Sequence, residues 1–211
     1  MNVSVRTSSG AVLPASVGAD DTRSRLLHAG LEMLFERGYH GTSIRDIAVG
    51  AGVQSATLYG HFASKEELLA ELIVLGHEEH HRRLIDALMD AGTDPRDQLR
   101  ALVSAYVTGH AEFAMLAIVA NAELSRLSPE AAAPARLLCD RSRELLMTVV
   151  SRGVRQGVFV MDHPEITINA IASMGTSVAL WYPPSADHLD VGVVCDTLSE
   201  LALRLVLAPT P

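Results

Sequence analysis

The stretch from Thr42 to Leu69, TSIRDIAVGAGVQSATLYGHFASKEELL, constrains the fold more than any other part of the chain. Its first half carries four apolar side chains at the spacing i, i+3, i+4, i+7 of one helical face, namely Ile44, Ile47, Ala48 and Ala51. Gly52 allows a tight turn to follow, because it has no Cβ atom. A second short helix, expected over residues 55–61, buries Leu58. Two short helices joined in this way predict a helix-turn-helix, which places one helix in the major groove of DNA.

The composition favours packed helices over sheets. The 211 residues are 48% hydrophobic but only 4% aromatic, whereas strands are enriched in aromatic and β-branched residues. The net charge of −8 argues against nonspecific coating of nucleic acid, although a small local surface can still bind DNA. We therefore predict an all-α chain with a disordered N-terminal arm over 1–19, a three-helix helix-turn-helix domain over 20–66, and a helical bundle over 67–211.

Turn and capping signals place the remaining helices. A first helix is expected to begin at Asp20 or Asp21 and to end at Gly38. A long helix should follow from Ser64 to about residue 91, and another from Asp94 to about residue 127 with a break near Gly109. Three more are expected over residues 129–157, 164–182 and 187–207, with Pro183 and Pro184 ending the second of them.

These residues, in this order and spacing, resemble a known family. The matching segments are Gly38-Tyr39, Thr42-Ser43-Ile44, Ile47-Ala48, Ala51-Gly52-Val53, Thr57-Leu58-Tyr59, His61-Phe62 and Ser64 to Leu69. Together they resemble the N-terminal domain of TetR-family transcriptional regulators over roughly residues 20–72. The resemblance implies a homodimeric repressor that is released from a palindromic DNA operator by a small effector. One departure is Gly60, where the family usually carries an aromatic residue.

The resemblance also implies which residues meet DNA. The major-groove helix would present Ser55, Ala56, Thr57 and Tyr59, with His61 beside the DNA backbone. No Arg or Asn on this helix offers a bidentate contact to a base, so Arg45 is the best candidate for a guanine or a phosphate. Thr42 and Ser43 lie at one helix N-terminus and Lys65, the only lysine, at another, where phosphates are favoured. Helix capping by Thr42, and core packing by Tyr59 and His61, are open alternatives.

Ligand binding and dimerisation are expected in the second domain. In the family the effector lies among the middle helices, where the apolar candidates are Leu102, Tyr106, Phe113, Leu116 and Val119, and Asn121 is a possible polar anchor. The expected effector is largely apolar, and the C-terminal pattern is similar to a branch that senses acyl-CoA-like thioesters. The last two helices carry the expected dimer interface, although both they and the pocket candidates could instead form an intramolecular core.

One further motif competes with this interpretation. His77-Glu78-Glu79-His80-His81 fits H-E-x-x-H, which would bring His77 and His81 together on one helical face as zinc ligands. A metal-responsive regulator or a metal-binding enzyme is therefore the alternative, and a chain that kept the fold but lost DNA binding is a third. The favoured interpretation requires no catalytic residue, cofactor or metal. It places the protein in the cytoplasm, without a membrane partner and with Cys139 and Cys195 as free thiols.

Overall fold

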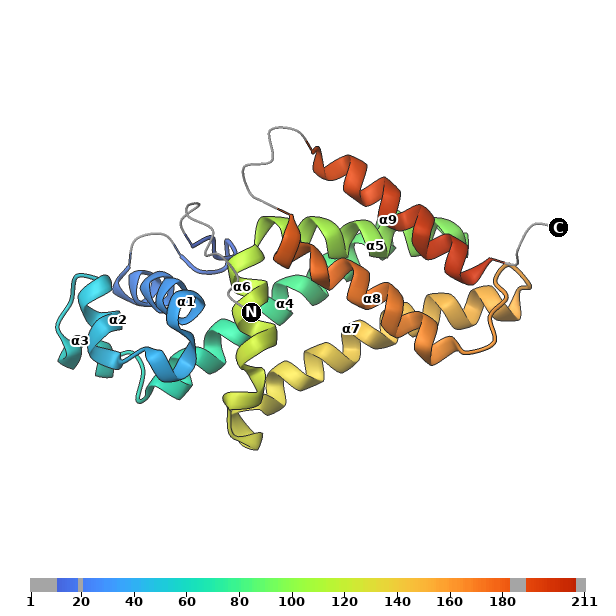
Figure 1. Ribbon diagram of the computed structural model, residues 1–211. Helices are drawn as coiled ribbons and strands as arrows, with labels where there is room; N and C mark the ends of the chain where they lie inside the picture. Colours follow the sequence, from blue (N-terminus) through green and yellow to red (C-terminus); the bar gives the residue numbers. More distant parts are fainter. Residues whose placement is uncertain (1–10, 19–20, 183–188, 208–211) are drawn as a thin grey trace. The chain divides into compact units, whose positions relative to one another are not determined.

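The computed structural model describes residues 11–18, 21–182 and 189–207, and all regular secondary structure within these ranges is helical (Figure 1). The all-α prediction is therefore confirmed. The chain divides into two compact units. Unit 1 comprises residues 1–77 and 115–136, and unit 2 comprises residues 78–114 and 137–211. The expected boundary after residue 66 falls in the first turn of α4 (Lys65–Asp90), and all of α6 (Ala114–Glu123) except Ala114 lies in unit 1.

Unit 1 contains the predicted helix-turn-helix. Helix α1 (Thr22–Gly41) is capped by Asp21, whose carboxylate accepts from the Ser24 N–H at 2.6 Å. Gly38, at φ 68° and ψ 176°, interrupts the helical backbone with a positive φ that glycine adopts readily, and α1 continues to Gly41, beyond the end expected at Gly38. Helices α2 (Ile44–Gly50) and α3 (Ser55–Tyr59) follow, and α3 is two residues shorter than predicted.

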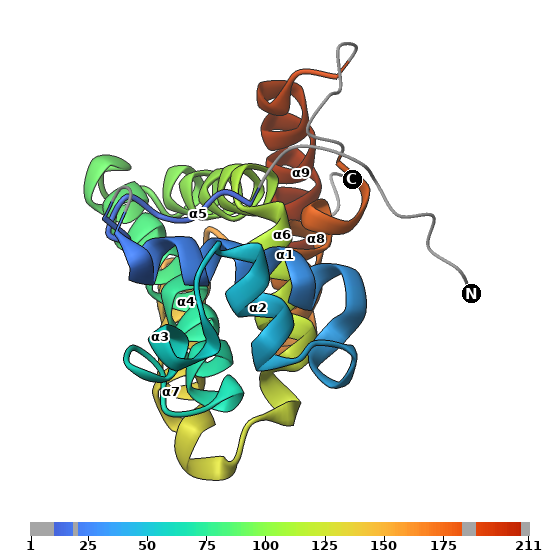
Figure 2. The same ribbon diagram turned by 90° about the vertical axis from the view of Figure 1, so that its left-hand side faces the viewer.

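Helices α1, α2 and α3 and the start of α4 come together in unit 1 (Figure 2), and their apolar side chains are buried in its core. Each fully buried leucine or isoleucine contributes about 1.5–3 kcal/mol relative to an exposed one. The predicted positions Ile47, Ala48 and Leu58 are all buried, which confirms the face assigned to α2 and α3. They are joined in this core by Leu26, Leu27, Leu31, Leu34, Phe62, Leu68 and Leu69.

The second segment of unit 1 consists of α6, the short 3-10 helix η1 (Leu124–Arg126) and the start of α7 (Pro129–Arg155). A Cβ atom on Gly76 would lie 3.3 Å from both the Ala120 Cβ and the Leu116 Cγ atoms. The absence of a side chain at Gly76 thus lets α6 pack closely against α4.

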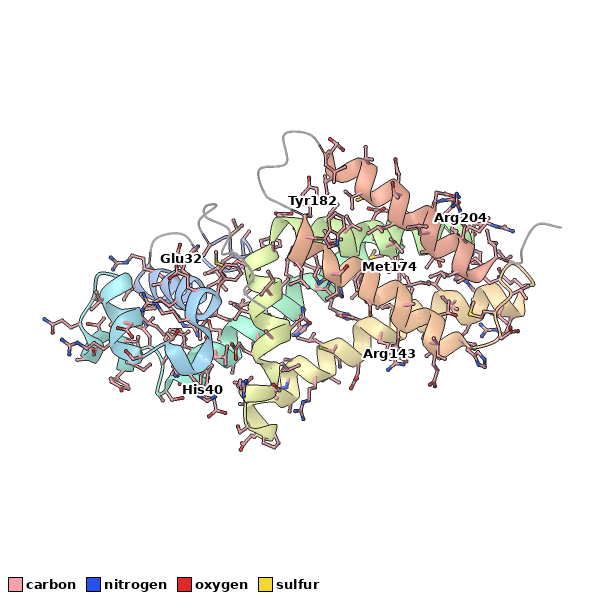
Figure 3. The ribbon with its side chains drawn as sticks, in the orientation of Figure 1. Glu32, His40, Arg143, Met174, Tyr182 and Arg204 are labelled. Carbon is pink, nitrogen blue, oxygen red and sulfur yellow. The ribbon has the colours of Figure 1, made fainter. Side chains whose placement is uncertain are left out.

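In unit 2, α5 (Pro95–Glu112) packs against both α8 (Pro164–Trp181) and α9 (Val191–Val206). A close approach of α8 to α5 lies at Gly175, where an added Cβ would lie 2.5 Å from the Tyr106 Cβ. Tyr182, labelled in Figure 3, donates its hydroxyl to the Leu189 carbonyl at 3.0 Å and so links the end of α8 to the start of α9. The core of this unit includes Leu102, Val103, Val107, Ile168, Val178 and Leu203.

Several predicted helix ends shift in the structure. Helix α5 passes through Gly109 without a break, and the break lies at Phe113, whose N–H donates to the Gly109 carbonyl at 3.0 Å. Of the expected arm, residues 11–18 have defined positions and include a buried Pro14, while 1–10 and 19 lie outside the described residues. The expected helix ends at Asp20, Pro183, Pro184 and Asp187 also lie outside them.

Within the described ranges, no single helix is long and apolar enough to cross a membrane. Helix α5 together with the segment Ala114–Arg126 passes that test by length and composition only, as a sharply bent pair.

Candidate DNA-binding surface

The turn between α2 and α3 presents the reading helix. Gly52 adopts φ 69°, and the Val53 N–H donates to the Ala48 carbonyl at 2.9 Å, which closes the turn. With Leu58 anchored in the core, the opposite side of α3 faces outward. Ala56 and Thr57 are exposed, Tyr59 is 57% exposed, and Ser55 is half-buried. The structure therefore brings the predicted reading residues together on one accessible surface.

Arg45 extends from the first turn of α2 and is exposed. Within the described part of the chain its side chain makes no hydrogen bond or ion pair, so the guanidinium is available to a DNA base or phosphate. An arginine in this state offers two parallel donors to a guanine or a phosphate.

Ser43 is occupied by a capping box at the start of α2. Its hydroxyl accepts from the Asp46 N–H at 3.1 Å, and the Ser43 N–H donates to the Asp46 carboxylate at 3.1 Å. Hydrogen bonds from the Ser43 hydroxyl and N–H, together with the charges of Arg37 and Arg45, hold the pKa of Asp46 below its ordinary value. This carboxylate stays ionised at neutral pH and repels phosphates near the N-terminus of α2.

Two predicted contact residues have partners inside the fold. Thr42 is only 2% exposed, and its hydroxyl lies 3.0 Å from the Met33 carbonyl oxygen and 2.9 Å from that of Gly38. Lys65 donates its ammonium to the Tyr39 carbonyl at 2.6 Å and to the Thr42 carbonyl at 2.7 Å. These atoms complete the corner between α1 and α2, where Thr42 is the C-terminal cap residue of α1 and Ser43 is the N-terminal cap residue of α2.

The two residues that follow α3, Gly60 and His61, are both exposed. Gly60 has an ordinary helical backbone at φ −72°, and its N–H lies within hydrogen-bonding distance of the Ala56 and Thr57 carbonyls. A Cβ atom there would lie 3.2 Å from the Thr57 carbonyl oxygen. The glycine therefore suits the tight end of α3, and a larger residue requires a small adjustment of the backbone.

The predicted ligand residues are divided between the two units. Leu102, Tyr106 and Phe113 are buried in unit 2, and Leu116 and Val119 are buried in unit 1. Asn121 is exposed and donates its amide to the Ala117 carbonyl at 2.8 Å, so it is placed as a surface residue of α6.

Sequence reasoning missed a polar cluster inside unit 2. The ring of His80 lies 4.4 Å from that of Tyr106 and 5.1 Å from that of His110, measured between centroids. Burial raises the pKa of Tyr106 to about 12 and lowers that of His110. The i, i+4 spacing of Tyr106 and His110 on one face was the available signal, but it could not reveal His80 on another helix.

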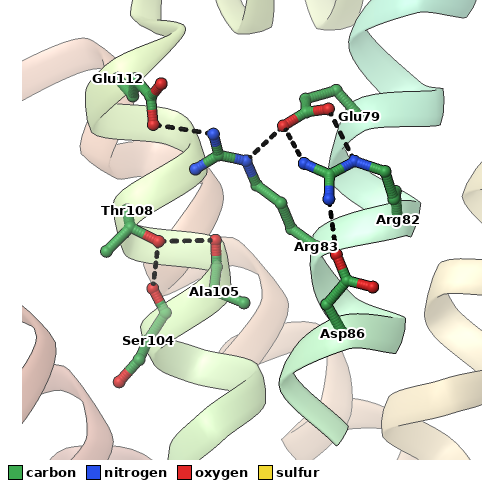
Figure 4. A network of polar contacts seen from close by, with 8 residues as sticks. All are labelled: Glu79, Arg82, Arg83, Asp86, Ser104, Ala105, Thr108 and Glu112. Carbon is green, nitrogen blue, oxygen red and sulfur yellow. Dashed lines mark hydrogen bonds and ion pairs between the residues drawn. The ribbon is translucent and has the colours of Figure 1, made fainter. Parts of the chain in front are cut away.

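An open groove of about 460 Å³ runs along α4 and α5 beside an ion-pair network (Figure 4). In this network Arg83 donates to Glu79 at 2.6 Å and to Glu112 at 2.8 Å, and its guanidinium lies 4.9 Å from the Phe113 ring centroid. Burial raises the pKa of Glu79, but hydrogen bonds from Arg82 and Arg83 more than offset this effect and keep it below its ordinary value. The network braces α4 against the end of α5.

The H-E-x-x-H segment does not form a metal centre in the described residues. No group of three or more His, Cys, Asp or Glu side chains is placed there to hold a metal ion. His77 is buried, and the Nδ1 atom of His81 lies 3.1 Å from the Ser142 hydroxyl. The metal alternative is therefore not favoured.

Comparison with known proteins matches both parts of the chain. The family "Bacterial regulatory proteins, tetR family" matches residues 26–72, and the family "Tetracyclin repressor-like, C-terminal domain" matches residues 92–206. The chain belongs to the TetR family. It is 32% identical over 205 residues to the HTH-type transcriptional repressor KstR2 of Rhodococcus jostii, covering 90% of this chain and 94% of the relative.

Two solved structures agree with this membership. A tetR-family regulatory protein from Rhodococcus RHA1 superposes with a TM-score of 0.83 at 29% identity, covering 91% of this chain and 100% of that one. The ketosteroid transcriptional regulator KstR2 of Mycobacterium tuberculosis superposes with a TM-score of 0.81 at 26% identity, covering 91% and 98% of the two chains. As a TetR-family protein, the chain is a ligand-responsive, DNA-binding transcriptional regulator.

Proposed function

We propose that this TetR-family protein is a cytoplasmic homodimeric repressor, without catalytic activity, that leaves a palindromic operator when a small, largely apolar effector binds. The exposed surface formed by α3 and Arg45 carries the proposal. The name of its Rhodococcus jostii relative, a transcriptional repressor, supports the sense of regulation.

The set of residues proposed to contact DNA is smaller than the set expected from the sequence. Thr57, Tyr59 and Ala56 read the major groove, with Ser55 and His61 at its edges, and Arg45 supplies the strongest single contact. Thr42, Ser43 and Lys65 act through the shape of the corner, because their side chains have internal partners. Such a reading surface is weakly specific, so operator affinity depends on two heads acting together.

Replacing Arg45 tests the DNA surface. In titrations with duplex DNA from the regions flanking its own gene, Arg45→Ala should weaken binding by about tenfold or more. The slope of log affinity against log salt should fall by about one for each head. Arg96→Ala, which removes the same charge from α5, should bind like the wild type. Equal binding by all three proteins would contradict the assignment of Arg45.

The dimer is proposed to form through α8 and α9. Large apolar side chains remain exposed on both helices, among them Ile166, Leu180, Trp181, Val193, Leu201 and Leu205. Two small residues of α8, Gly175 and Ala179, are buried in their own unit and are not available to a partner.

Placing charge on this surface tests the interface. Leu201→Glu combined with Leu205→Glu should convert a dimer into monomers in sedimentation velocity, because two carboxylates would have to be buried at the interface. The matched control Met89→Glu changes a side chain that is 78% exposed on α4 and should leave the dimer intact. A dimer that survives the double substitution would place the interface elsewhere.

We propose an acyl-CoA-like thioester as the effector class. Its apolar part would be held within unit 2 by buried residues among Leu102, Tyr106 and Phe113, and the Tyr106 hydroxyl is suited to donate to a carbonyl oxygen. An acyl-CoA should displace the protein from the duplex at concentrations at which coenzyme A alone has no effect. Displacement by neither compound, or by both equally, would exclude this class.

A further inference from the structure

The backbone of Tyr39 is held from two sides within unit 1. Its N–H donates to the Glu123 carboxylate at 3.2 Å, and its carbonyl accepts from the Lys65 ammonium at 2.6 Å. Glu123 ends α6, Lys65 begins α4, and Tyr39 lies at the corner that leads into α2. The backbone of Tyr39, at the entry to the helix-turn-helix, therefore binds a carboxylate from α6 and an ammonium group from α4.

Gly38 makes the approach of Glu123 possible. Its φ of 68° is a conformation that other residues rarely adopt, and an added Cβ atom would lie 3.2 Å from the Glu123 Oε1 atom. The Glu123 side chain is only 15% exposed, and its other carboxylate oxygen lies 3.7 Å from the Arg126 guanidinium. The carboxylate is thus fixed on the Tyr39 N–H by its surroundings.

A second carboxylate joins the same two segments of unit 1 in the opposite direction, from α4 to the corner between η1 and α7. Glu66, the residue after Lys65, accepts from the Ser128 N–H at 2.7 Å, just before α7 begins. Hydrogen bonds from the Ser128 N–H and hydroxyl hold the pKa of Glu66 below its ordinary value. Glu123 therefore reaches from α6 to the helix-turn-helix, while Glu66 reaches from α4 to the η1–α7 corner.

These two contacts join segments that match different family domains. Tyr39, Lys65 and Glu66 lie in the DNA-binding match over residues 26–72, and Glu123 and Ser128 lie in the C-terminal match over 92–206. Residues 115–136 nevertheless fold with the DNA-binding helices in unit 1. Part of the segment that matches the C-terminal family domain therefore folds in unit 1, together with the reading helix α3.

We propose that Glu123 and Glu66 form a coupling joint that links the state of α6 to the position of α2 and α3. This inference rests on the proposed function, since it names how regulation of the DNA surface is transmitted. A charged acceptor on a backbone N–H is among the stronger hydrogen bonds, so a shift of α6 either moves the Tyr39 corner or breaks the contact. Ser43, which caps α2, lies four residues beyond Tyr39 and moves with that corner.

Hydrogen exchange tests the joint without a known effector, because coupling between two sites is reciprocal. Duplex DNA from the regions flanking its own gene is added to the full-length wild type, and exchange is followed by mass spectrometry. DNA should slow exchange in α3, and also in residues 115–128 by about tenfold. In Glu123→Ala, α3 should still be protected, whereas slowing at residues 115–128 should fall below about twofold.

Two variants separate coupling from simple stabilisation. Glu123→Asp keeps the charge but shortens the side chain, and should behave like Glu123→Ala. Glu130→Ala removes an exposed carboxylate from the first turn of α7 and should retain the wild-type response. Full DNA-induced slowing at residues 115–128 in Glu123→Ala, or none in the wild type despite protection of α3, would overturn the joint. Absence of any DNA complex with the wild type would instead overturn the proposed function, and the joint with it.

Discussion

The ammonium of Lys65 closes the corner on which the helix-turn-helix depends. It binds the carbonyl oxygens of Tyr39 and Thr42 and lies 4.0 Å from the Tyr39 ring centroid. Carbonyls at the end of a helix lack partners within that helix and must find them elsewhere. Lys65 supplies both bonds from the start of α4 and so fixes where α1 stops and α2 begins. The orientation of α2, and through the Gly52 turn that of α3, follows from this corner.

Much of this domain could be predicted from local sequence signals. The apolar spacing of Ile47 and Ala48, and the glycines Gly38 and Gly52, each specify one local conformation, and the structure realises all of them. The roles of Thr42 and Lys65 could not be predicted in the same way. A threonine or lysine at a helix N-terminus can serve a phosphate or a backbone carbonyl equally well. The tertiary contact of Lys65 with Tyr39, 26 residues away, gives it backbone partners that no local pattern could show.

The division of the chain was also hidden from local patterns. The periodicity of α6 shows that it has a buried face but does not show which helices cover that face. Its packing against Gly76 and the contact between Glu123 and Tyr39 place α6 with the DNA-binding helices. In the same way, the close approach of Gly175 to Tyr106 depends on contacts between distant helices. Individual helices were therefore easier to predict than the units they form.

The central claim is that Lys65 braces the fold through its bonds to the Tyr39 and Thr42 carbonyls. Because it is the only lysine in the chain, acetylation of its side chain by an amine-reactive ester can be followed by mass spectrometry without ambiguity. The account predicts that Lys65 reacts at least about tenfold more slowly in the folded protein than in urea, since its hydrogen bonds must open first. Labelling of the folded protein as fast as in urea would contradict the account.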